Sequence, residues 1–189
     1  MAGSNTGSEM KLCIPPLGAL IALKEQWHFR LYFESRNATV LAGFLDGSKK
    51  VVIPWVRHLD DLWYGKGTEP AWSKRGREEW KTLFASFRAA GFTIHKAKKP
   101  QQPEDEVYKS FLTQVPLPYI DVSLPPTTVL AIDRYYIRQG AEAFDSLTFK
   151  VEKCPLASFG NPGKVAKMPI RRFWACLQDV NNIECEVLG

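Results

Sequence analysis

Cysteine is scarce in this sequence, and no two cysteines form a C-x-x-C pair. The four cysteines stand at positions 13, 154, 176 and 185 of 189 residues. The chain opens with MAGSNTGSEMK, a small and polar stretch without the basic and apolar regions of a secretory signal. Because disulfide frameworks belong to oxidising compartments, we expect free thiols here. These features predict a soluble intracellular protein and do not distinguish the cytoplasm from a nuclear or nucleoid location.

Long apolar runs are also missing. The segment LGALIAL, at residues 17–23, is the longest apolar run near the N-terminus. A membrane-spanning helix needs about 20 consecutive apolar residues, so this segment is far too short. We therefore expect no membrane partner.

The sequence lacks the common catalytic motifs. H-E-x-x-H, G-x-S-x-G and G-x-G-x-x-G do not occur. GNPGK, at residues 160–164, is similar to the last residues of a phosphate-binding loop but lacks the leading glycine of that motif. In addition, Val165 stands where a serine or threonine would bind magnesium, so a surface turn is the simpler interpretation. The motifs predict no cofactor and favour binding over catalysis.

A metal-dependent enzyme acting on nucleic acid is a third hypothesis. Its potential ligands are His58, Asp60, Asp61 and Asp133. The first three stand in one loop without a second cluster, a pattern more typical of a solvated turn than of a metal site. Asp133 lies in a strand-like run, where an ion pair with Arg134 or Arg138 is the simpler role. We predict no metal site, and the enzyme hypothesis requires a deep pocket that holds at least two of these side chains.

The sequence does contain ample material for a hydrophobic core. Hydrophobic residues make up 45% of the chain and aromatic residues 12%, more than disordered chains contain. The length fits one sizeable domain or two small ones. The 25 Lys and Arg against 20 Asp and Glu give a net charge of +5. An excess of this size suits a polyanionic partner but is also common in proteins without one.

Alternation and turn signals predict an antiparallel β-meander over residues 27–56. In WHFRLYFES the large apolar residues Trp27, Phe29, Leu31 and Phe33 share one face, which is the period of a half-buried strand. We expect ATVLAGFL and KKVVIPWV to follow as strands, with a turn at DGSK between them. FTIHKA, further along, is expected to form another strand.

The stretch SKRGREEWKTLFASFRAAGFTI, at residues 73–94, predicts one main amphipathic helix. Its apolar residues recur at three- and four-residue spacing and are Trp80, Leu83, Phe84, Phe87 and Ala90. We expect this stripe to pack on the sheet and Gly91 to end the helix as its C-cap. Phe92 is then placed to pack back on Phe87.

Residues 98–107 are the predicted linker, because KKPQQPEDE contains two prolines and no apolar residue. After an irregular, proline-rich piece, four short strands are expected in TTVLAIDRYYIRQG, SLTFKVEK, RRFWACLQ and IECEV. The predicted fold is α+β: an antiparallel β-meander covered by one main amphipathic helix, followed by a small strand-rich, barrel-like half. The expected domains are a disordered tail at 1–11, a module at 12–97 and a module at 108–189, unless both modules form one compact domain.

Two basic segments make nucleic acid, RNA or DNA, the leading partner. The stretch 153–172 has no acidic residue and carries Lys153, Lys164, Lys167, Arg171 and Arg172. The start of the helix carries Lys74, Arg75 and Arg77, which oppose the helix dipole and are expected to be unpaired. These cations would neutralise phosphates in a non-catalytic nucleic-acid-binding protein.

A protein partner is the main alternative. Three aromatic residues fall in or next to a loop-like segment that contains LWYGKG, and they are Trp63, Tyr64 and Trp72. Exposed tryptophan and tyrosine side chains often form the centre of protein interfaces. This alternative describes an interaction or inhibitor module that docks through the aromatic loop.

Overall fold

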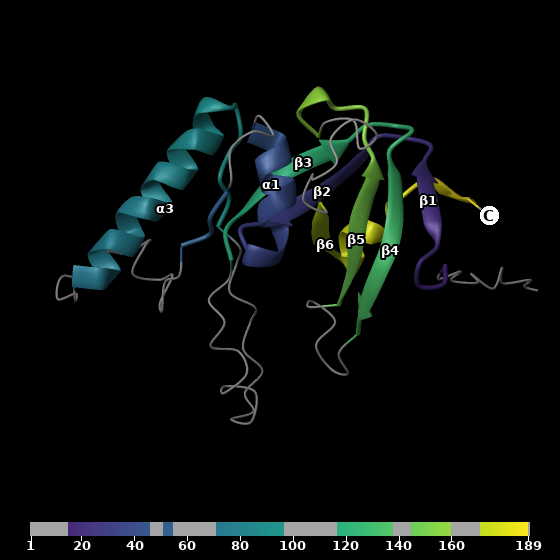
Figure 1. Ribbon diagram of the computed structural model, residues 1–189, viewed down its shortest axis with the longest axis horizontal. Coiled ribbons are helices and arrows are strands. Elements are labelled where there is room, and N and C mark those ends of the chain that lie inside the picture. Colours follow the sequence, from purple (N-terminus) through teal and green to yellow (C-terminus); the bar gives the residue numbers. More distant parts are fainter. Residues whose placement is uncertain are drawn as a thin grey trace, which may run out of the picture.

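The computed structural model describes residues 15–45, 51–54, 71–96, 117–137, 145–159 and 171–188. In these parts the chain is α+β, as predicted, and its strands form two antiparallel sheets (Figure 1). The predicted tail at 1–11 and the predicted linker at 98–107 lie outside the described residues.

The larger sheet has five strands in the order β6-β5-β4-β1-β7. Their bounds are β1 Leu20–Leu23, β4 Val129–Tyr136, β5 Ser146–Lys153, β6 Arg172–Cys176 and β7 Cys185–Leu188. The last four confirm the strands predicted in the C-terminal half. β1 comes from the apolar run near the N-terminus, which was not predicted as a strand, and it pairs with both β4 and β7. The sheet is open, and the described strands do not close into a barrel.

The smaller sheet consists of β2 (Trp27–Tyr32) and β3 (Tyr119–Leu124). β3 lies in the proline-rich stretch, for which no strand was predicted. The two sheets share one core, in which aromatic rings from β2 pack on rings from β5 and β6. The ring centroids of Phe29 and Phe173 are 5.1 Å apart, and those of Trp27 and Phe149 are 5.5 Å apart.

The predicted meander over residues 27–56 is wrong beyond its first strand. ATVLAGFL is the helix α1 (Ala38–Leu45), which follows a single turn of 3-10 helix, η1 (Ser35–Asn37). Periodicity cannot separate a buried helix from a buried strand in a short run that is apolar throughout. Residues 51–54 form no strand, and FTIHKA contributes only one bridge, between His95 and Tyr119.

Two residues, Asn37 and Gly43, explain how α1 packs on the sheet. The amide of Asn37 is fully buried; its Nδ2 donates to the Tyr32 carbonyl at 2.9 Å and its Oδ1 accepts from the Trp174 backbone at 3.0 Å. Gly43 lets the helix approach closely, because an added Cβ would lie 2.6 Å from Nη1 of Arg171. The helix thus packs against the segment that leads into β6.

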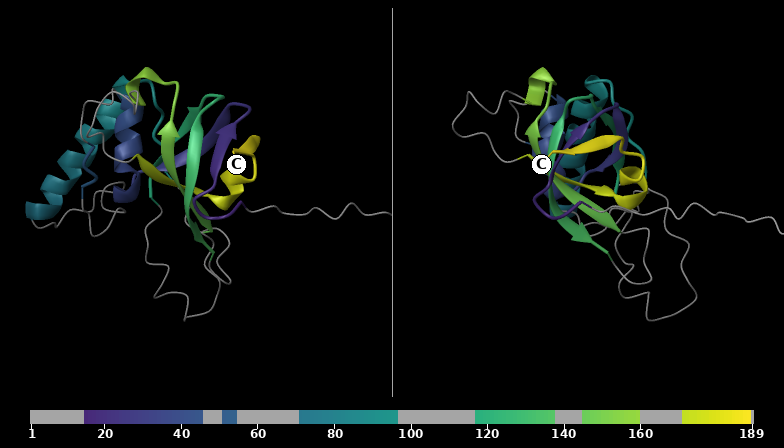
Figure 2. Two further views of the ribbon diagram at one scale, coloured as in Figure 1. Left: turned by 45° about the vertical axis from the view of Figure 1, so that its right-hand side comes forward. Right: turned by 90° about the vertical axis from the view of Figure 1, so that its right-hand side faces the viewer.

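The predicted main helix is confirmed as α3 (Ala71–Ala89), which lies with α1 on the side of the molecule away from β1 (Figures 1 and 2). Trp80, Phe84 and Phe87 are buried, and each packs edge-on against Phe33. The helix ends before Gly91, whose φ of 91° is the left-handed conformation expected at a C-cap. The ring of Phe92 then packs on that of Phe87, at 5.9 Å, as predicted.

Two short helical segments complete the described structure. η3 (Ala157–Phe159) follows β5, and α5 (Leu177–Val180) follows β6 directly. The predicted turn DVNN begins inside α5. Asp179 in this helix accepts from Nη2 of Arg30 at 2.9 Å, which ties α5 to β2.

Candidate nucleic-acid interface

The predicted basic start of α3 is partly neutralised by its own helix. Arg75 was expected to be unpaired, but its Nε lies 2.8 Å from Oε1 of Glu79. One turn further on, Nζ of Lys81 lies 2.8 Å from Oε1 of Glu78. Glu78 and Glu79 therefore offset two of the four positive charges that Lys74, Arg75, Arg77 and Lys81 carry.

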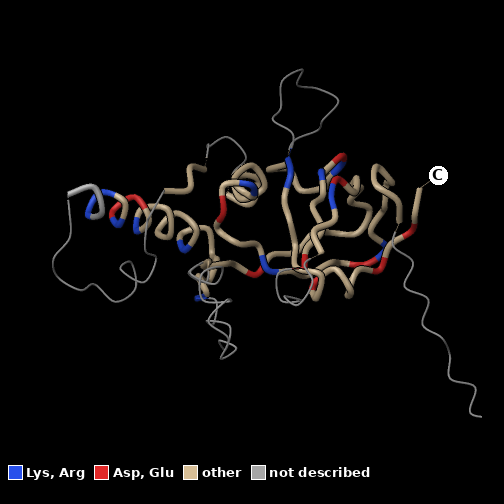
Figure 3. The backbone as a smooth tube through the Cα atoms, turned by 90° about the horizontal axis from the view of Figure 1, so that it is seen from below, with Lys and Arg blue, Asp and Glu red and all other residues tan. Residues whose placement is uncertain are grey.

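This helix start is also remote from the described part of the second predicted segment. Figure 1 shows α3 beginning at the outer edge of the molecule, far from β5 and β6. In Figure 3 the basic positions at the start of the helix are followed by acidic ones and then by further basic ones. Lys74 is exposed and Arg77 is half-buried and has a partner. The structure therefore does not join the two predicted basic segments at the helix start.

Several predicted site residues lie outside the described residues. These are Lys164 and Lys167 of the basic segment, Trp63 and Tyr64 of the aromatic loop, the side chain of Trp72, and the potential ligands His58, Asp60 and Asp61. Of the basic segment, Lys153, Arg171 and Arg172 are described. Lys153 is exposed at the end of β5.

Arg171 was predicted to contact phosphate, but its side chain is turned into the protein. The residue is 7% exposed, and its Nη2 donates to the Ser158 carbonyl at 3.1 Å. Its guanidinium lies 4.6 Å from the centre of the Phe159 ring, and burial lowers the pKa of the group. Among the described residues, Nη1 has no hydrogen-bond partner. In this conformation Arg171 packs η3 against β6 and presents little surface to a ligand.

Arg172 points the other way and belongs to a cluster of charges on the sheet. Because strand residues alternate between faces, the neighbours of the core rings Phe149 and Phe173 lie on the opposite face. Lys150 and Arg172 are such neighbours, and they stand directly opposite each other in β5 and β6. A register irregularity in β4 between Ile132 and Arg134 brings Asp133 to the same place.

Three cations surround the single carboxylate of Asp133. Nζ of Lys150 lies 2.7 Å from Oδ1, Nε of Arg172 lies 3.1 Å from Oδ2, and Nε of Arg134 lies 3.6 Å from Oδ2. The Asp133 side chain is 10% exposed, whereas that of Arg134 is 71% exposed. The predicted ion pair with Arg134 is confirmed. Three positive charges against one negative charge give what we call the Asp133 cluster a net charge of +2.

The electrostatics of the cluster keep its carboxylate charged. The hydrogen bond from Lys150 lowers the pKa of Asp133, and the charges of Arg172 and Arg134 act in the same direction. Partial burial opposes these effects but does not outweigh them. The backbone N–H of Arg172 donates to Oγ1 of Thr39 at 3.3 Å, which fixes this end of β6 against α1. The cations are therefore held in place around a permanent negative charge.

Next to the cluster, four half-buried rings form a row across four chain segments. The rings belong to Trp174 in β6, Tyr32 in β2, Tyr119 in β3 and His95. Successive centroids are 4.9, 5.5 and 5.1 Å apart, and the two outer pairs are stacked. The guanidinium of Arg36 covers the end of this aromatic row, 5.4 Å from the centre of the Trp174 ring.

Sequence reasoning missed half of this surface. Lys150 and Tyr119 enter it only through strand pairing, with Arg172 and Tyr32 as their direct partners. His95 joins through one isolated bridge. No local pattern in the sequence reports such pairings, although alternation in the segment around Tyr119 does place that ring on the solvent face.

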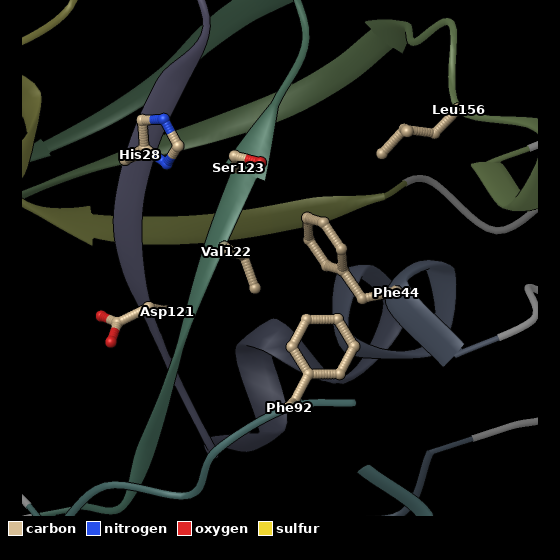
Figure 4. A pocket seen from close by; sticks show the side chains of 7 residues that line it. All are labelled: His28, Phe44, Phe92, Asp121, Val122, Ser123 and Leu156. Atoms are coloured by element: carbon tan, nitrogen blue, oxygen red, sulfur yellow. The ribbon is translucent and has the colours of Figure 1, made fainter. Parts of the chain in front are cut away.

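An open cavity of about 320 Å³ lies elsewhere, beside β3 (Figure 4). It is lined by His28, Phe44, Phe92, Asp121, Val122, Ser123 and Leu156. Figure 4 shows His28, Ser123 and Asp121 on one side of β3 and the two phenylalanines on the other. Asp121 also contacts the aromatic row, since its Oδ2 lies 3.0 Å from Nε2 of His95. The cavity does not contain Asp133, so among the described residues it gives no support to the enzyme hypothesis.

Within the part of the chain that the structure describes, no group of three or more His, Cys, Asp and Glu side chains could hold a metal ion. None of the described helices combines the length and the hydropathy needed to cross a bilayer. Comparison with protein-family models, with curated proteins and with solved structures returns no match to this chain.

Proposed function

We propose that the protein binds nucleic acid through the outer face of β4, β5 and β6. The observation that carries this proposal is the Asp133 cluster, in which three fixed cations share one carboxylate. Phosphate groups of the ligand would offset the two excess positive charges. Arginine suits this role because its planar guanidinium can donate two hydrogen bonds to one phosphate.

The geometry of the cluster favours an extended polyanion. The side chains of Lys150, Arg172 and Arg134 are 32%, 39% and 71% exposed, so all three can reach a ligand while they keep their contact with Asp133. They lie on three adjacent strands, which spreads the contacts across the sheet. The net charge of +5 on the whole chain would attract a polyanion over longer distances.

Lys153 is exposed at the end of β5, and its predicted contribution, like that of Lys164 and Lys167, stays part of the proposal. The start of α3 is left out, because Arg75 is paired with Glu79 along the helix and the helix start lies far from β5 and β6. Arg171 is left out because it is buried. The alternative of a protein partner at Trp63, Tyr64 and Trp72 stays a prediction outside the described side chains.

A matched pair of double variants tests the proposal. Arg134→Gln with Lys150→Gln removes two charges from the Asp133 cluster, and Arg75→Gln with Lys81→Gln removes two charges from α3. Binding of a fluorescein-labelled oligonucleotide of about 16 nucleotides is followed by anisotropy between about 50 and 200 mM salt. We expect the cluster variant to lose about tenfold in affinity and to reduce the salt slope by one to two.

The α3 variant is the control for net charge, since it has the same overall charge as the cluster variant. We expect it to bind within about twofold of the unaltered protein, because its lost charges were already offset by Glu79 and Glu78. Equal losses in both variants would show that net charge alone drives binding. No binding by the unaltered protein at the lowest salt concentration would overturn the proposal.

A further inference from the structure

The aromatic row beside the Asp133 cluster has an inner end, formed by Trp174 and Tyr32, and an outer end, formed by Tyr119 and His95. Among the described residues, β2 and β6 share no backbone ladder. The stacked rings of Tyr32 and Trp174, with an interplanar angle of 9°, bridge this gap together with Asn37. The inner end of the row is therefore part of the packing.

The outer end of the row is held by fewer contacts, which are the bridge to Tyr119 and a contact of 3.0 Å between Nε2 of His95 and Oδ2 of Asp121. His95 stacks on Tyr119 with an interplanar angle of 20°, yet it belongs to an isolated bridge and not to a strand. Its side chain is 37% exposed. Among the described residues, no second ring stacks on the imidazole. The face of His95 turned away from Tyr119 therefore carries no second ring and is the face on which a planar ligand would stack.

At the inner end of the row, the ring of Trp174 could also stack on a ligand if the Arg36 side chain moved. One face of the Trp174 indole is against Tyr32, and the other is covered by the guanidinium of Arg36. The Arg36 side chain is 57% exposed and pairs with Glu34, so it can move aside or stack on a ligand itself. A base that inserted here would lie between an aromatic ring and a guanidinium, both of which stack on nucleobases.

We infer that the aromatic row is a stacking platform for unpaired bases and that the ligand is a single-stranded nucleic acid. This inference rests on the proposed function, since the Asp133 cluster would hold the phosphates. Arg172 and Trp174 are two residues apart on the same face of β6, about 7 Å along the strand. One nucleotide can therefore place its phosphate on the cluster and its base on the row.

Double-stranded nucleic acid cannot use the row in this way. Its bases are paired and stacked inside the helix, so it presents its phosphates to a sheet face and no free base plane. Single strands expose base planes of every sequence, and stacking on aromatic side chains tolerates all of them. The platform therefore selects for strandedness and not for a particular sequence.

The test compares three probes of one mixed sequence, each of about 16 nucleotides: a DNA single strand, the same strand in a duplex, and an RNA single strand. Anisotropy titrations at one moderate salt concentration give the affinity for each probe. We expect both single strands to bind about tenfold more tightly than the duplex. The ratio between the two single strands shows whether the 2′-hydroxyl adds to recognition.

Variants at the exposed end of the row then connect the preference to the rings. His95→Ala, alone and with Tyr119→Leu, should weaken binding of both single strands by about fivefold to tenfold and leave duplex binding within about twofold. Val187→Ala is the control, because it removes an apolar side chain that is 55% exposed on β7, at the opposite edge of the five-stranded sheet from β6. It should not change the ratio of single-strand to duplex affinity.

A photo-crosslinking experiment on the unaltered protein tests the same inference even if a variant fails to fold. A single strand that carries 5-iodouracil should crosslink to His95, Tyr119 or Trp174, as mapped by mass spectrometry. Equal affinity for duplex and single strand, or crosslinks only to rings outside the row, would overturn this inference while the proposed function stands. No binding of any probe would overturn both.

Discussion

This chain has two basic regions: the start of α3 and the outer face of β4, β5 and β6. They contain similar numbers of cations but differ in how acidic residues are placed around them. On α3, Arg75 and Lys81 each have an acidic residue three or four positions away. All four of these side chains are at least 46% exposed, so water screens both partners of each pair. On the sheet, one carboxylate that is 10% exposed faces three cations.

The difference follows from how each element brings charges together. A helix places side chains three and four residues apart on one face, so a mixed charged sequence neutralises itself locally. A sheet brings together residues from distant parts of the chain, and here Lys150 and Arg172 share the single carboxylate of Asp133 with Arg134. Basic residues in a sequence therefore indicate a binding surface only when their neighbours in space are also known.

The largest expected effect is the difference in the free energy of unfolding between alanine variants at the adjacent residues Arg171 and Arg172. Arg171→Ala removes a buried side chain that packs on Phe159 and donates to Ser158. We expect it to lower the free energy of unfolding by about 3 kcal/mol, through the cavity and the lost hydrogen bond. Arg172→Ala, at a half-exposed position, should cost about 1 kcal/mol. Urea titrations followed by circular dichroism measure both values.

Arg171→Met is the companion variant. It keeps most of the side-chain volume and removes a buried charge that has no acidic partner among the described residues, so it should recover much of the lost stability. Equal costs for the alanine variants at 171 and 172 would contradict the inward placement of Arg171.

The next largest effect concerns Asp133 and pH. The lowered pKa of its carboxyl means that its stabilising contribution is complete above the unfolded-state value, near 3.9, and is lost as pH falls through the folded-state value. Asp133→Asn should therefore lower the free energy of unfolding by about 2 kcal/mol near neutral pH. This gap should begin to narrow below about pH 4, where the unfolded chain takes up the proton, and should close as pH falls through the lowered folded-state pKa.

Glu78→Gln is the matched control on α3, since it also removes one negative charge beside a cation. Its side chain is 62% exposed, and we expect the stability to stay unchanged within error at both pH values. An Asp133→Asn gap that is constant with pH would show that the loss comes from packing and not from the charge.

Much of the fold could be predicted from local patterns. α3 and its glycine C-cap follow from the helical stripe, and β4 to β7 follow from alternation and turns. α1 could not be predicted because a short apolar run satisfies both periods. β3 was hidden by flanking prolines, although its buried residues Ile120, Val122 and Leu124 alternate as a strand requires.

The candidate site was less accessible to sequence reasoning. The ion pair between Asp133 and Arg134 could be predicted because the two residues are adjacent. The contributions of Lys150 and Tyr119 depend on strand register, which forms only in the folded chain. The inward direction of Arg171 did have a signal, because it shares its face of the strand with Phe173 and Ala175, both fully buried. The basic composition of the loop obscured that alternation.

The most direct test of the comparison is the affinity of Asp133→Asn for single-stranded nucleic acid, measured beside Glu78→Gln at neutral pH and moderate salt. Both variants add the same charge to the protein, but only Asp133→Asn raises the net charge of the cluster from +2 to +3. We expect Asp133→Asn to bind about fivefold more tightly than the unaltered protein and Glu78→Gln to bind equally well. Weaker or unchanged binding by a folded Asp133→Asn protein would contradict the assignment of phosphate contacts to this cluster.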